Sequence, residues 1–482
     1  MGFCLYIQVR IAMFDLLIKN GTVITVDEKH TIYKNGFVAV KGDRIALMGD
    51  MDSLDENITA EKVIDAKGNA VLPGLIDTHG HGGHCLTKTL GEHLGDGWEP
   101  MAEGIYHKFS DNEFWRAEGA LAAAERLKFG VTTGVSMIGN TVRVGDLDVV
   151  QSHIEGTLET GIRHVTGAGC PNPVWNKPAR KWHSLNEYTA YEVTPETAFD
   201  FTPKALKAFK GKYDRCDFIV MPSRMGRNRE NSDELNIRQN KFMYQLSKEF
   251  DTVIHSHSYA GDMLFMMETS PEVFDSKMFL AHSTGMSEKE WEIMAKHDVA
   301  VCHGPSTNAN VNVRCPAVEM LENGVNVVIA TDGTAPDRSF DLLKDIKLFS
   351  FLHKGFFHDS NMLHAGLVLE MITIRAAKAM GKEKEIGSLE VGKKADIIII
   401  DCHQPHLAPW GVMPVQRIVN HATGADVSHT IVDGKVVMEN RRLTMADENK
   451  IINDAEKAFD LMCKRSGVLD YAVDNNKLWQ VK

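Results

Sequence analysis

The sequence has no Cys-x-x-Cys pair and no long run of basic residues. Its eight cysteines are scattered, and a chain of 482 residues is large enough to fold without disulfide bonds. We therefore expect reduced thiols in a cytoplasmic protein. The 53 Lys and Arg residues against 65 Asp and Glu give a net charge of -12. This negative balance argues against a protein whose main function is to bind the phosphate backbone of DNA or RNA, so we expect no nucleic-acid partner.

The first twelve residues lack the marks of a targeting segment. They are mildly apolar, but Arg10 interrupts the run and no small-residue cleavage site follows. Tyr6 stands where a myristoylation signal requires Ser or Thr. A β pattern begins cleanly at Met13. We therefore expect residues 1–12 to be a dispensable extension and the protein to have no membrane partner.

Apolar material is ample, and its pattern at both ends of the chain predicts β structure. Hydrophobic residues make up 43% of the chain and charged residues 24%, a composition typical of globular proteins. Short alternating apolar stretches separated by Asn-Gly and Lys-Gly turns occupy residues 16–70, and the same pattern returns after residue 385. We predict one small β-sandwich domain built from residues 1–72 and 385–450.

Between these ends, helical patterns alternate with short apolar strands. Counting from the strand that precedes His79, residues 73–384 contain eight such strands. Eight repeats of strand and helix predict a parallel (β/α)8 barrel, that is, a TIM barrel in the α/β class. We expect residues 451–482 to form a C-terminal helical tail.

Histidine and aspartate follow the ends of four of the predicted barrel strands. His79 and His81 follow the first strand, and residues two apart in a strand face the same way. His257 follows the fifth strand, His282 the sixth and Asp332 the eighth. The working residues of such barrels lie at the C-terminal ends of their strands, where these side chains can converge. The pattern therefore predicts a metal site.

Four stretches of the chain resemble the amidohydrolase superfamily. They are residues 73–81, 124–133, 327–333 and 387–396. Among its members the chain is most similar to the branch of triazine chlorohydrolases and of aminohydrolases that resemble adenosine and guanine deaminases. The resemblance covers about residues 14–440. Its motifs are specific for the superfamily and not for a substrate.

The resemblance implies a set of site residues. His79, His81, His257 and Asp332 would hold one divalent metal ion, and His282 would hydrogen-bond or ligate the hydrolytic water. We expect zinc ahead of iron, manganese or cobalt. Residues 218–222 on the fourth strand lack the lysine with which two-metal members bridge their ions. One ion is therefore expected.

The same set of residues predicts a hydrolase. A bound divalent ion lowers the pKa of its water from about 15.7 to about 7, which makes hydroxide available for attack. Asp332 can take the proton of the water and pass it to the leaving nitrogen, and His282 can stabilise the oxyanion. We predict hydrolysis of a carbon–nitrogen bond other than a peptide bond, in an amide, urea, carbamate, lactam or cyclic amidine.

The chain departs at two positions from the branch that it resembles, and these departures keep other functions open. Ala260 stands where that branch commonly has a glutamate that protonates a ring nitrogen, and Gly285 stands where it often has a second histidine. Deamination or dechlorination of an N-heteroaromatic ring is therefore the alternative reaction. A non-catalytic metal-binding barrel that serves as a scaffold is the alternative from another class.

Residues outside this set are candidates for contact with a small-molecule substrate. They are His84, Trp98, Arg224 and His303. A plain loop position or a packing role is the competing interpretation for each. Residues 175–191 are rich in aromatics and show no clear period, so they form either a lid over the substrate or a contact between subunits. We expect a homo-oligomer.

Overall fold

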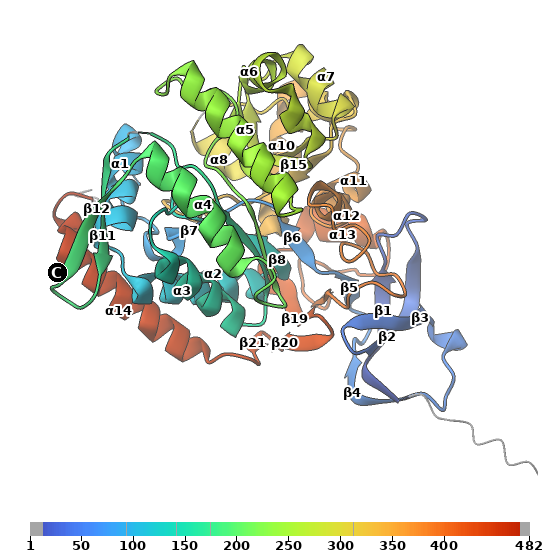
Figure 1. Cartoon of the computed structure of the whole chain (residues 1–482). Coiled ribbons are helices and arrows are strands. Elements are labelled where there is room, and N and C mark those ends of the chain that lie inside the picture. The colour runs from blue at the N-terminus through green and yellow to red at the C-terminus, as the bar shows by residue number, and fades with distance from the viewer. Residues whose placement is uncertain (1–12, 93, 141, 174, 312, 473–482) are drawn as a thin grey trace, which may run out of the picture.

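The computed structural model describes residues 13–92, 94–140, 142–173, 175–311 and 313–472. Residues 1–12 lie outside this range, so the dispensable extension stays a prediction. The chain builds a large α/β body and, beside it, a sheet formed by both of its ends (Figure 1). Within the described residues, no helix is long and apolar enough to cross a membrane.

The α/β body contains a parallel sheet of eight strands. Its order is β17-β16-β15-β14-β13-β10-β8-β6, so neighbours in space follow one another along the chain. The predicted eight-stranded barrel fold is confirmed. Its strands are β6 (Leu75–Asp77), β8 (Val131–Val135), β10 (Arg163–Ala168), β13 (Cys216–Val220), β14 (Ile254–Tyr259), β15 (Met278–Thr284), β16 (Ala300–His303) and β17 (Val327–Ile329).

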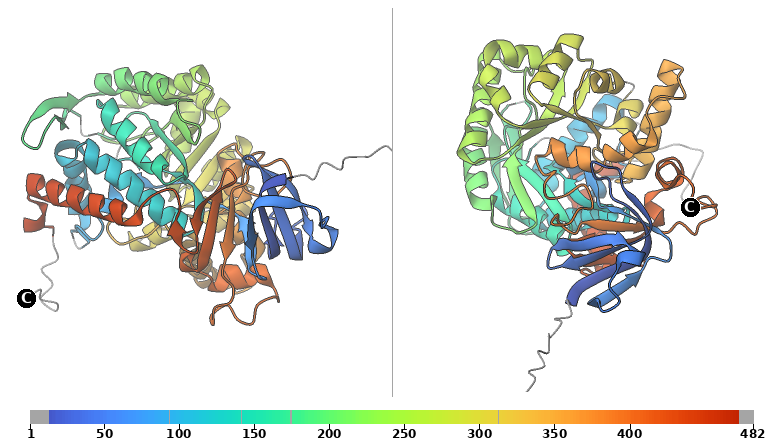
Figure 2. Two further views of the ribbon diagram at one scale, coloured as in Figure 1. Left: turned by 90° about the horizontal axis from the view of Figure 1, so that it is seen from below. Right: turned by 90° about the vertical axis from the view of Figure 1, so that its right-hand side faces the viewer.

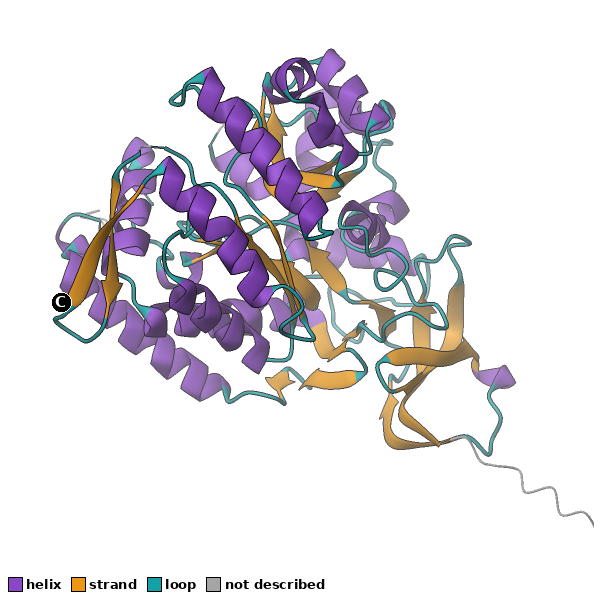
Figure 3. Ribbon diagram, viewed as in Figure 1, coloured by secondary structure: helices purple, strands orange, loops and turns teal. Residues whose placement is uncertain are grey.

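Helices surround this sheet (Figure 3). They are α1 (Trp98–Gly104), α2 (Asn112–Lys128), α3 (Leu147–Glu159), α4 (Pro195–Phe209), α5 (Asp233–Glu249), α6 (Asp262–Thr269), α7 (Glu288–Lys296), α8 (Pro305–Asn310), α9 (Ala317–Glu322), α10 (Leu342–Phe357), α11 (Ala365–Glu370) and α12 (Ile374–Ala379). Helix α2 shows how the local sequence sets these bounds. The Asp111 side chain accepts a hydrogen bond from the Phe114 amide at its start. Gly130, at a φ of +82°, turns the chain into β8.

The first and last barrel strands, β6 and β17, lie at the two ends of the sheet order. The segment before α12 accepts backbone hydrogen bonds from both strands. The Ile76 amide donates to the Ile372 carbonyl at 2.9 Å, and the Ile329 amide donates to the Met371 carbonyl at 3.2 Å. Neighbouring residues of one segment thus span the seam between the two strands.

A buried carboxylate also bridges this seam. Asp77, at the end of β6, accepts hydrogen bonds from the amide and the hydroxyl of Thr331, which follows β17, at 3.0 and 2.8 Å. It also accepts from Nε and Nη2 of Arg126 on α2, at 3.2 and 3.1 Å. Asp77 is fully buried. These bonds fix the backbone directly before Asp332.

The second sheet combines strands from the two ends of the chain (Figure 2). It consists of β1 (Met13–Ile24), β2 (Ile32–Lys41), β3 (Arg44–Asp50), β4 (Thr59–Asp65), β5 (Ala70–Pro73), β18 (Ile397–Ile400), β19 (Val427–Val432), β20 (Lys435–Glu439) and β21 (Arg442–Leu443). The ends meet where β5 pairs antiparallel with β18, with Ala70 opposite Ile400 and Pro73 opposite Ile397. All four isoleucines of β18 are buried. A separate sandwich domain stays a prediction.

Charged side chains join this sheet to the barrel. Nη2 of Arg163, at the start of β10, lies 3.1 Å from Oδ1 of Asp396 and also contacts Asp433. Burial lowers the pKa of Arg163, but the two carboxylates outweigh it and raise the pKa above the ordinary value. The guanidinium therefore remains charged at this junction.

Two further helices are α13 (Pro414–His421), between β18 and β19, and α14 (Glu448–Ser466), after β21. Helix α14 packs along α2 of the barrel. Nζ of Lys128 lies 2.6 Å from Oε2 of Glu448, and Nη1 of Arg465 lies 2.6 Å from Oδ2 of Asp111. The helix begins three residues before the predicted tail. We keep the units 1–72 with 385–450, 73–384 and 451–482 as a proposal.

Residues 175–191, expected to be an aromatic loop, contain most of a two-stranded hairpin. Strand β11 (Lys177–Trp182) pairs antiparallel with β12 (Tyr188–Val193). The Trp182 indole donates to the Lys108 carbonyl at 2.9 Å, and the Arg465 guanidinium lies 3.9 Å from the Trp182 ring centroid. The hairpin therefore packs beside α14, at the end of the barrel opposite the second sheet (Figure 1).

Candidate metal and catalytic site

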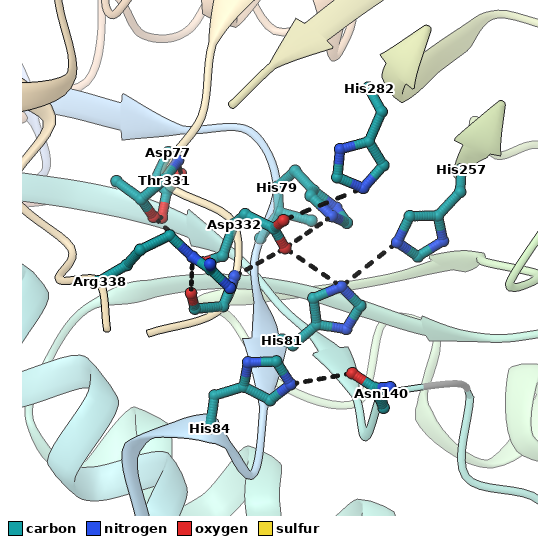
Figure 4. A network of polar contacts seen from close by, with 12 residues as sticks. Asp77, His79, His81, His84, Asn140, His257, His282, Thr331, Asp332 and Arg338 are labelled. Atoms are coloured by element: carbon teal, nitrogen blue, oxygen red, sulfur yellow. Dashed lines mark hydrogen bonds and ion pairs between the residues drawn. The ribbon is translucent and has the colours of Figure 1, made fainter. Parts of the chain in front are cut away.

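Four histidines and one aspartate from the ends of four barrel strands gather at one point (Figure 4). Ligand atoms of His79, His81 and His257 lie within 4.8 Å of one another, and so do those of His79, His282 and Asp332. All five side chains are buried or nearly so. The structure thus brings together every residue for which the sequence predicts metal binding or catalysis.

The Nε2 lone pairs of His81 and His257 point at each other. Nδ1 of His81 lies 2.8 Å from the Gly139 carbonyl oxygen, and Nδ1 of His257 lies 2.5 Å from the Ser223 carbonyl oxygen. Because a carbonyl oxygen only accepts, each Nδ1 carries the proton and each Nε2 carries a lone pair. These two Nε2 atoms are 3.3 Å apart. Such a contact is unfavourable unless a cation lies between the lone pairs, and this arrangement fits a metal ion.

A chain of hydrogen bonds gives His79 the same tautomer. His255 donates from Nδ1 to the Phe279 carbonyl at 2.8 Å, so its Nε2 accepts the Nδ1 proton of His79, also at 2.8 Å. Nε2 of His79 then carries a lone pair and has no hydrogen-bond partner in the described part of the chain. A third nitrogen lone pair thus points at the same place. Such outer partners commonly orient metal ligands.

Asp332 supplies the negative charge of the cluster. Its Oδ1 lies 3.4 Å from Nε2 of His79 and 3.3 Å from Nε2 of His81, and its Oδ2 lies 4.0 Å from Nε2 of His282. Oδ1 also accepts the Gly333 amide at 2.7 Å. The carboxylate is thus oriented toward three imidazoles, within reach of an ion or of a water molecule bound there.

The backbone around this cluster is strained. His282 has a φ of +70° and Asp332 a φ of +64°, in the left-handed region that these residues seldom adopt. Such conformations cost on the order of 1–3 kcal/mol each and persist where the surroundings impose them. Arg338 holds the turn after Asp332 by donating to the Gly333 carbonyl at 2.9 Å. The fold therefore holds these two side chains in place at an energetic cost.

Burial keeps three of the imidazoles uncharged. It lowers the pKa of His81 and of His282 to about 4, and the pKa of His257 well below its usual value. Burial would raise the pKa of Asp332, but the neighbouring His79 and His282 outweigh it and hold that pKa well below the usual range. Neutral imidazoles beside an ionised carboxylate are a donor set that suits zinc and similar divalent ions.

Two of the predicted substrate contacts lie beside the cluster. The ring of His84 stacks on that of His81, with centroids 5.0 Å apart and planes at 16°. Its Nε2 lies 3.2 Å from Oδ1 of Asn140. Trp98 meets the His84 ring edge-on at 5.7 Å. His84 and Trp98 therefore line the approach to the cluster, and substrate contact remains our proposal for both.

Arg224 lies beside the cluster, but its charge is already compensated. The backbone of Arg224 bridges that of His257. Its guanidinium binds both carboxylate oxygens of Asp262, at 3.0 and 3.1 Å. The same guanidinium lies 4.9 Å from the ring centroid of Tyr259. This pairing does not favour the role of an anion receptor.

His303 has surroundings of a different kind. Ala300 and Cys302 belong to the cluster inside the barrel, so the alternation of β16 turns His303 toward the outer helices. Its ring contacts Phe349 and His353 of α10, with centroids 5.6 and 5.7 Å away. The contacts therefore support packing, and its role in binding substrate stays a prediction.

The sequence reasoning missed Tyr259, the last residue of β14. It lies two residues beyond His257 and so shares the inward face of that strand, a signal that was available from the sequence. Its ring stacks on His282, with centroids 5.7 Å apart and planes at 13°. Burial, and next the charge of Asp332, raise the pKa of Tyr259. Ala260, which stands where the resembling branch has a glutamate, is exposed.

A cavity of about 670 Å³ opens at Arg224. Its wall carries charges of both signs and an indole. Its charged residues are Glu99, Glu103, Lys177, Arg224, Arg229 and Glu230, and Trp175 adds the indole. A cavity of about this size is large enough for a small organic molecule. A second cavity of about 680 Å³ lies between α2 and α14, lined by residues outside the cluster.

Curated relatives match the chain over nearly its whole length. A 5'-deoxyadenosine deaminase of Methanosarcina acetivorans is 31% identical over 457 residues, which are 94% of this chain and 100% of the relative. A 5-methylthioadenosine/S-adenosylhomocysteine deaminase of Acetivibrio thermocellus is 28% identical over 459 residues, covering 91% of this chain and 97% of the relative.

Solved structures share the fold at lower identity. An adenosine deaminase from Xanthomonas campestris with bound zinc superimposes with a TM-score of 0.77 at 20% identity, over 94% of this chain and 99% of that one. An atrazine chlorohydrolase from Arthrobacter aurescens, complexed with zinc, gives a TM-score of 0.74 at 21% identity, over 92% and 100%. Both structures support the barrel fold.

The model of the amidohydrolase family matches residues 70–437. This span holds all eight barrel strands and every residue of the cluster. The family predicted from the sequence motifs, and the hydrolase activity predicted with it, are confirmed. The chain belongs to the amidohydrolase family and is a hydrolase that acts on carbon–nitrogen bonds other than peptide bonds.

Proposed function

We propose that this protein uses one divalent metal ion, zinc in the first place, to hydrolyse a carbon–nitrogen bond in a small molecule. One observation carries the proposal: buried nitrogen lone pairs and a carboxylate converge at the mouth of the barrel, with two facing Nε2 atoms 3.3 Å apart. His79, His81, His257 and Asp332 would hold the ion. When bound, the ion lowers the pKa of a water molecule and polarises the substrate.

Asp332 and His282 carry the proton and charge chemistry of the reaction. The Asp332 carboxylate is ionised and can accept the proton of the attacking water. It then returns this proton to the leaving nitrogen, so the carboxylate is regenerated in each cycle. Nε2 of His282 lies 4.0 Å from Asp332 and can donate to, or orient, the oxygen that attacks.

Amides, ureas, carbamates, lactams and cyclic amidines are the substrates that this site favours. Their reacting carbon needs no protonation of a ring nitrogen, and Ala260 offers no acid for that step. Deamination of a purine nucleoside is the second candidate, because two relatives are named deaminases of 5'-deoxyadenosine and 5-methylthioadenosine. Dechlorination of a heteroaromatic ring is the third candidate.

A substrate screen with two arms tests this proposal. One arm follows ammonia release from 5'-deoxyadenosine and 5'-methylthioadenosine, and the other follows hydrolysis of simple amides, ureas and lactams. We expect zinc-loaded protein to turn over the second arm faster. Faster ammonia release from the nucleosides would reverse the order of the two candidates. No turnover in either arm, with full metal occupancy, would favour a metal-binding scaffold.

We also propose that the protein is a cytoplasmic homo-oligomer. The described cysteines are all buried and free, as expected for reduced thiols. Exposed apolar side chains on α10 support an interface. They are Phe351, Leu352, Phe356 and Phe357. Light scattering of the purified protein tests the assembly, and a monomeric mass at micromolar concentration would contradict it.

A further inference from the structure

The end of β14 carries a tyrosine whose ring is fixed on the side of the metal cluster. Tyr259 and His257 share one face of the strand. The Tyr259 ring stacks on His282 at 5.7 Å, nearly parallel to it. The tyrosine ring is thus in contact with one of the proposed catalytic side chains.

A buried ion pair holds this ring in place. The Arg224 guanidinium lies 4.9 Å from the Tyr259 ring centroid and binds Asp262 through two hydrogen bonds. Asp262 also accepts the amide of Tyr259 at 2.7 Å and the amide of Arg227 at 2.8 Å. Its side chain is only 1% exposed. Four hydrogen bonds thus fix the carboxylate, which fixes the guanidinium and the backbone of the tyrosine.

The Tyr259 hydroxyl is left without a protein partner. Among the described residues we find no hydrogen bond to this oxygen, and the side chain is partly exposed. The hydroxyl can therefore bond to water or to a ligand. The stacking on His282 places this side chain next to the proposed catalytic residues.

The other acidic groups at this strand end are already engaged. Asp262 binds Arg224. Glu290 accepts the Gly261 amide at 2.8 Å and the Ser287 amide at 2.9 Å, and it is buried. Neither can fill the position that Ala260 leaves without an acid. Ser258 also has a buried hydroxyl without a partner, but it alternates to the opposite face of β14. The Tyr259 hydroxyl therefore lies on the strand face that carries His257.

We propose that the Tyr259 hydroxyl donates a hydrogen bond to the substrate atom that gains negative charge when the reacting carbon is attacked. In an amide, urea or lactam this atom is the carbonyl oxygen. The phenol keeps its proton throughout, so it stabilises charge while Asp332 moves the proton. Arg224 and Asp262 are positioning residues for this hydroxyl. The inference rests on the proposed function and names the part of the substrate that the site recognises.

Tyr259→Phe tests the role of the hydroxyl, because it removes one oxygen and keeps the stacked ring. Removing one such donor lowers kcat by about 10²–10³-fold in comparable sites. We expect a loss of this size on the best substrate of the screen, with KM changed little and metal content unchanged. Tyr213→Phe is the matched control, since the Tyr213 hydroxyl donates to Oε1 of Glu155 at 3.3 Å, outside the cluster. It should keep the parent kcat.

A double variant tests the positioning role. Arg224→Leu should lower kcat in the parent, but it should lower kcat little further when Tyr259→Phe is already present, because both changes remove one interaction. An Arg224 that served only the fold would lower kcat by the same factor in both backgrounds.

The outcomes separate this inference from the proposed function. If Tyr259→Phe keeps kcat within about threefold of an active parent, the hydroxyl has no role and the hydrolase proposal stands. If the zinc-loaded parent hydrolyses nothing in the screen, the proposed function fails and this inference fails with it.

Discussion

Replacing Asp77 with alanine should destabilise the barrel strongly. The carboxylate is fully buried and accepts four hydrogen bonds from Arg126 and Thr331. Removing one partner of a buried ion pair costs about 3–5 kcal/mol, because the other charge is left buried without compensation. Arg126 would keep its bonds to the Ser136 hydroxyl at 2.8 Å and the Val135 carbonyl at 3.0 Å. We therefore expect the lower end, about 3 kcal/mol.

Chemical denaturation followed by circular dichroism measures this loss, with metal removed so that ligand binding does not contribute. Asp77→Asn is the matched variant. It keeps the shape and one acceptor oxygen but removes the charge that pairs with Arg126, so its loss should be smaller. Replacing Asp77 and Arg126 together by Leu and Met should recover part of the loss, since no buried charge remains. A loss below about 1 kcal/mol in Asp77→Ala would refute the view that this carboxylate closes the seam.

Three further changes have defined outcomes. Asp332→Asn should keep the fold and much of the metal, but lower kcat by at least about 10²–10⁴-fold, because the amide cannot take a proton from water; turnover within tenfold of the parent would make Asp332 a ligand only. Burial raises the pKa of Asp345 to about 8. This pKa lies above that of an aspartate in the unfolded chain, so the folded state binds more protons between about pH 4 and pH 8. The free energy of unfolding should therefore fall as the pH rises, by up to about 1.4 kcal/mol per pH unit. Asp345→Asn should remove that slope in denaturation at pH 5 and pH 8, and an unchanged slope would contradict the assignment. A chain starting at Met13 should fold as the full chain does, by circular dichroism and solubility; an insoluble product would show that residues 1–12 pack somewhere.

The barrel and its cluster could be predicted because both follow from local patterns. Each barrel strand is a short buried run, and the proposed ligands lie directly at strand ends, where the fold dictates which way they converge. Counting the strands was therefore enough to predict where the site lies. His255, two residues before His257 on the same strand, supports the cluster through its hydrogen bond to His79.

Positions that depend on packing beyond the strand were harder to predict. The orientation of His303 followed from the inward positions of Ala300 and Cys302, which no motif reveals. The pairing of Arg224 with Asp262 was not predicted, because Asp262 lies 38 residues away along the chain.

The hairpin of β11 and β12 was missed for a different reason. Its two strands bury only Ala179 and Val193, so there is no alternation of buried and exposed residues to recognise.

Metal analysis of purified protein tests the central claim most directly. Mass spectrometry of the parent, grown with ample zinc, should find one ion per chain. His79→Ala and His257→Ala should lose the ion and the activity together, because each removes one ligand of a mononuclear site. His403→Ala, at an exposed side chain in another part of the fold, should keep both. Full metal occupancy in both ligand variants would contradict the assignment of this cluster as the metal site.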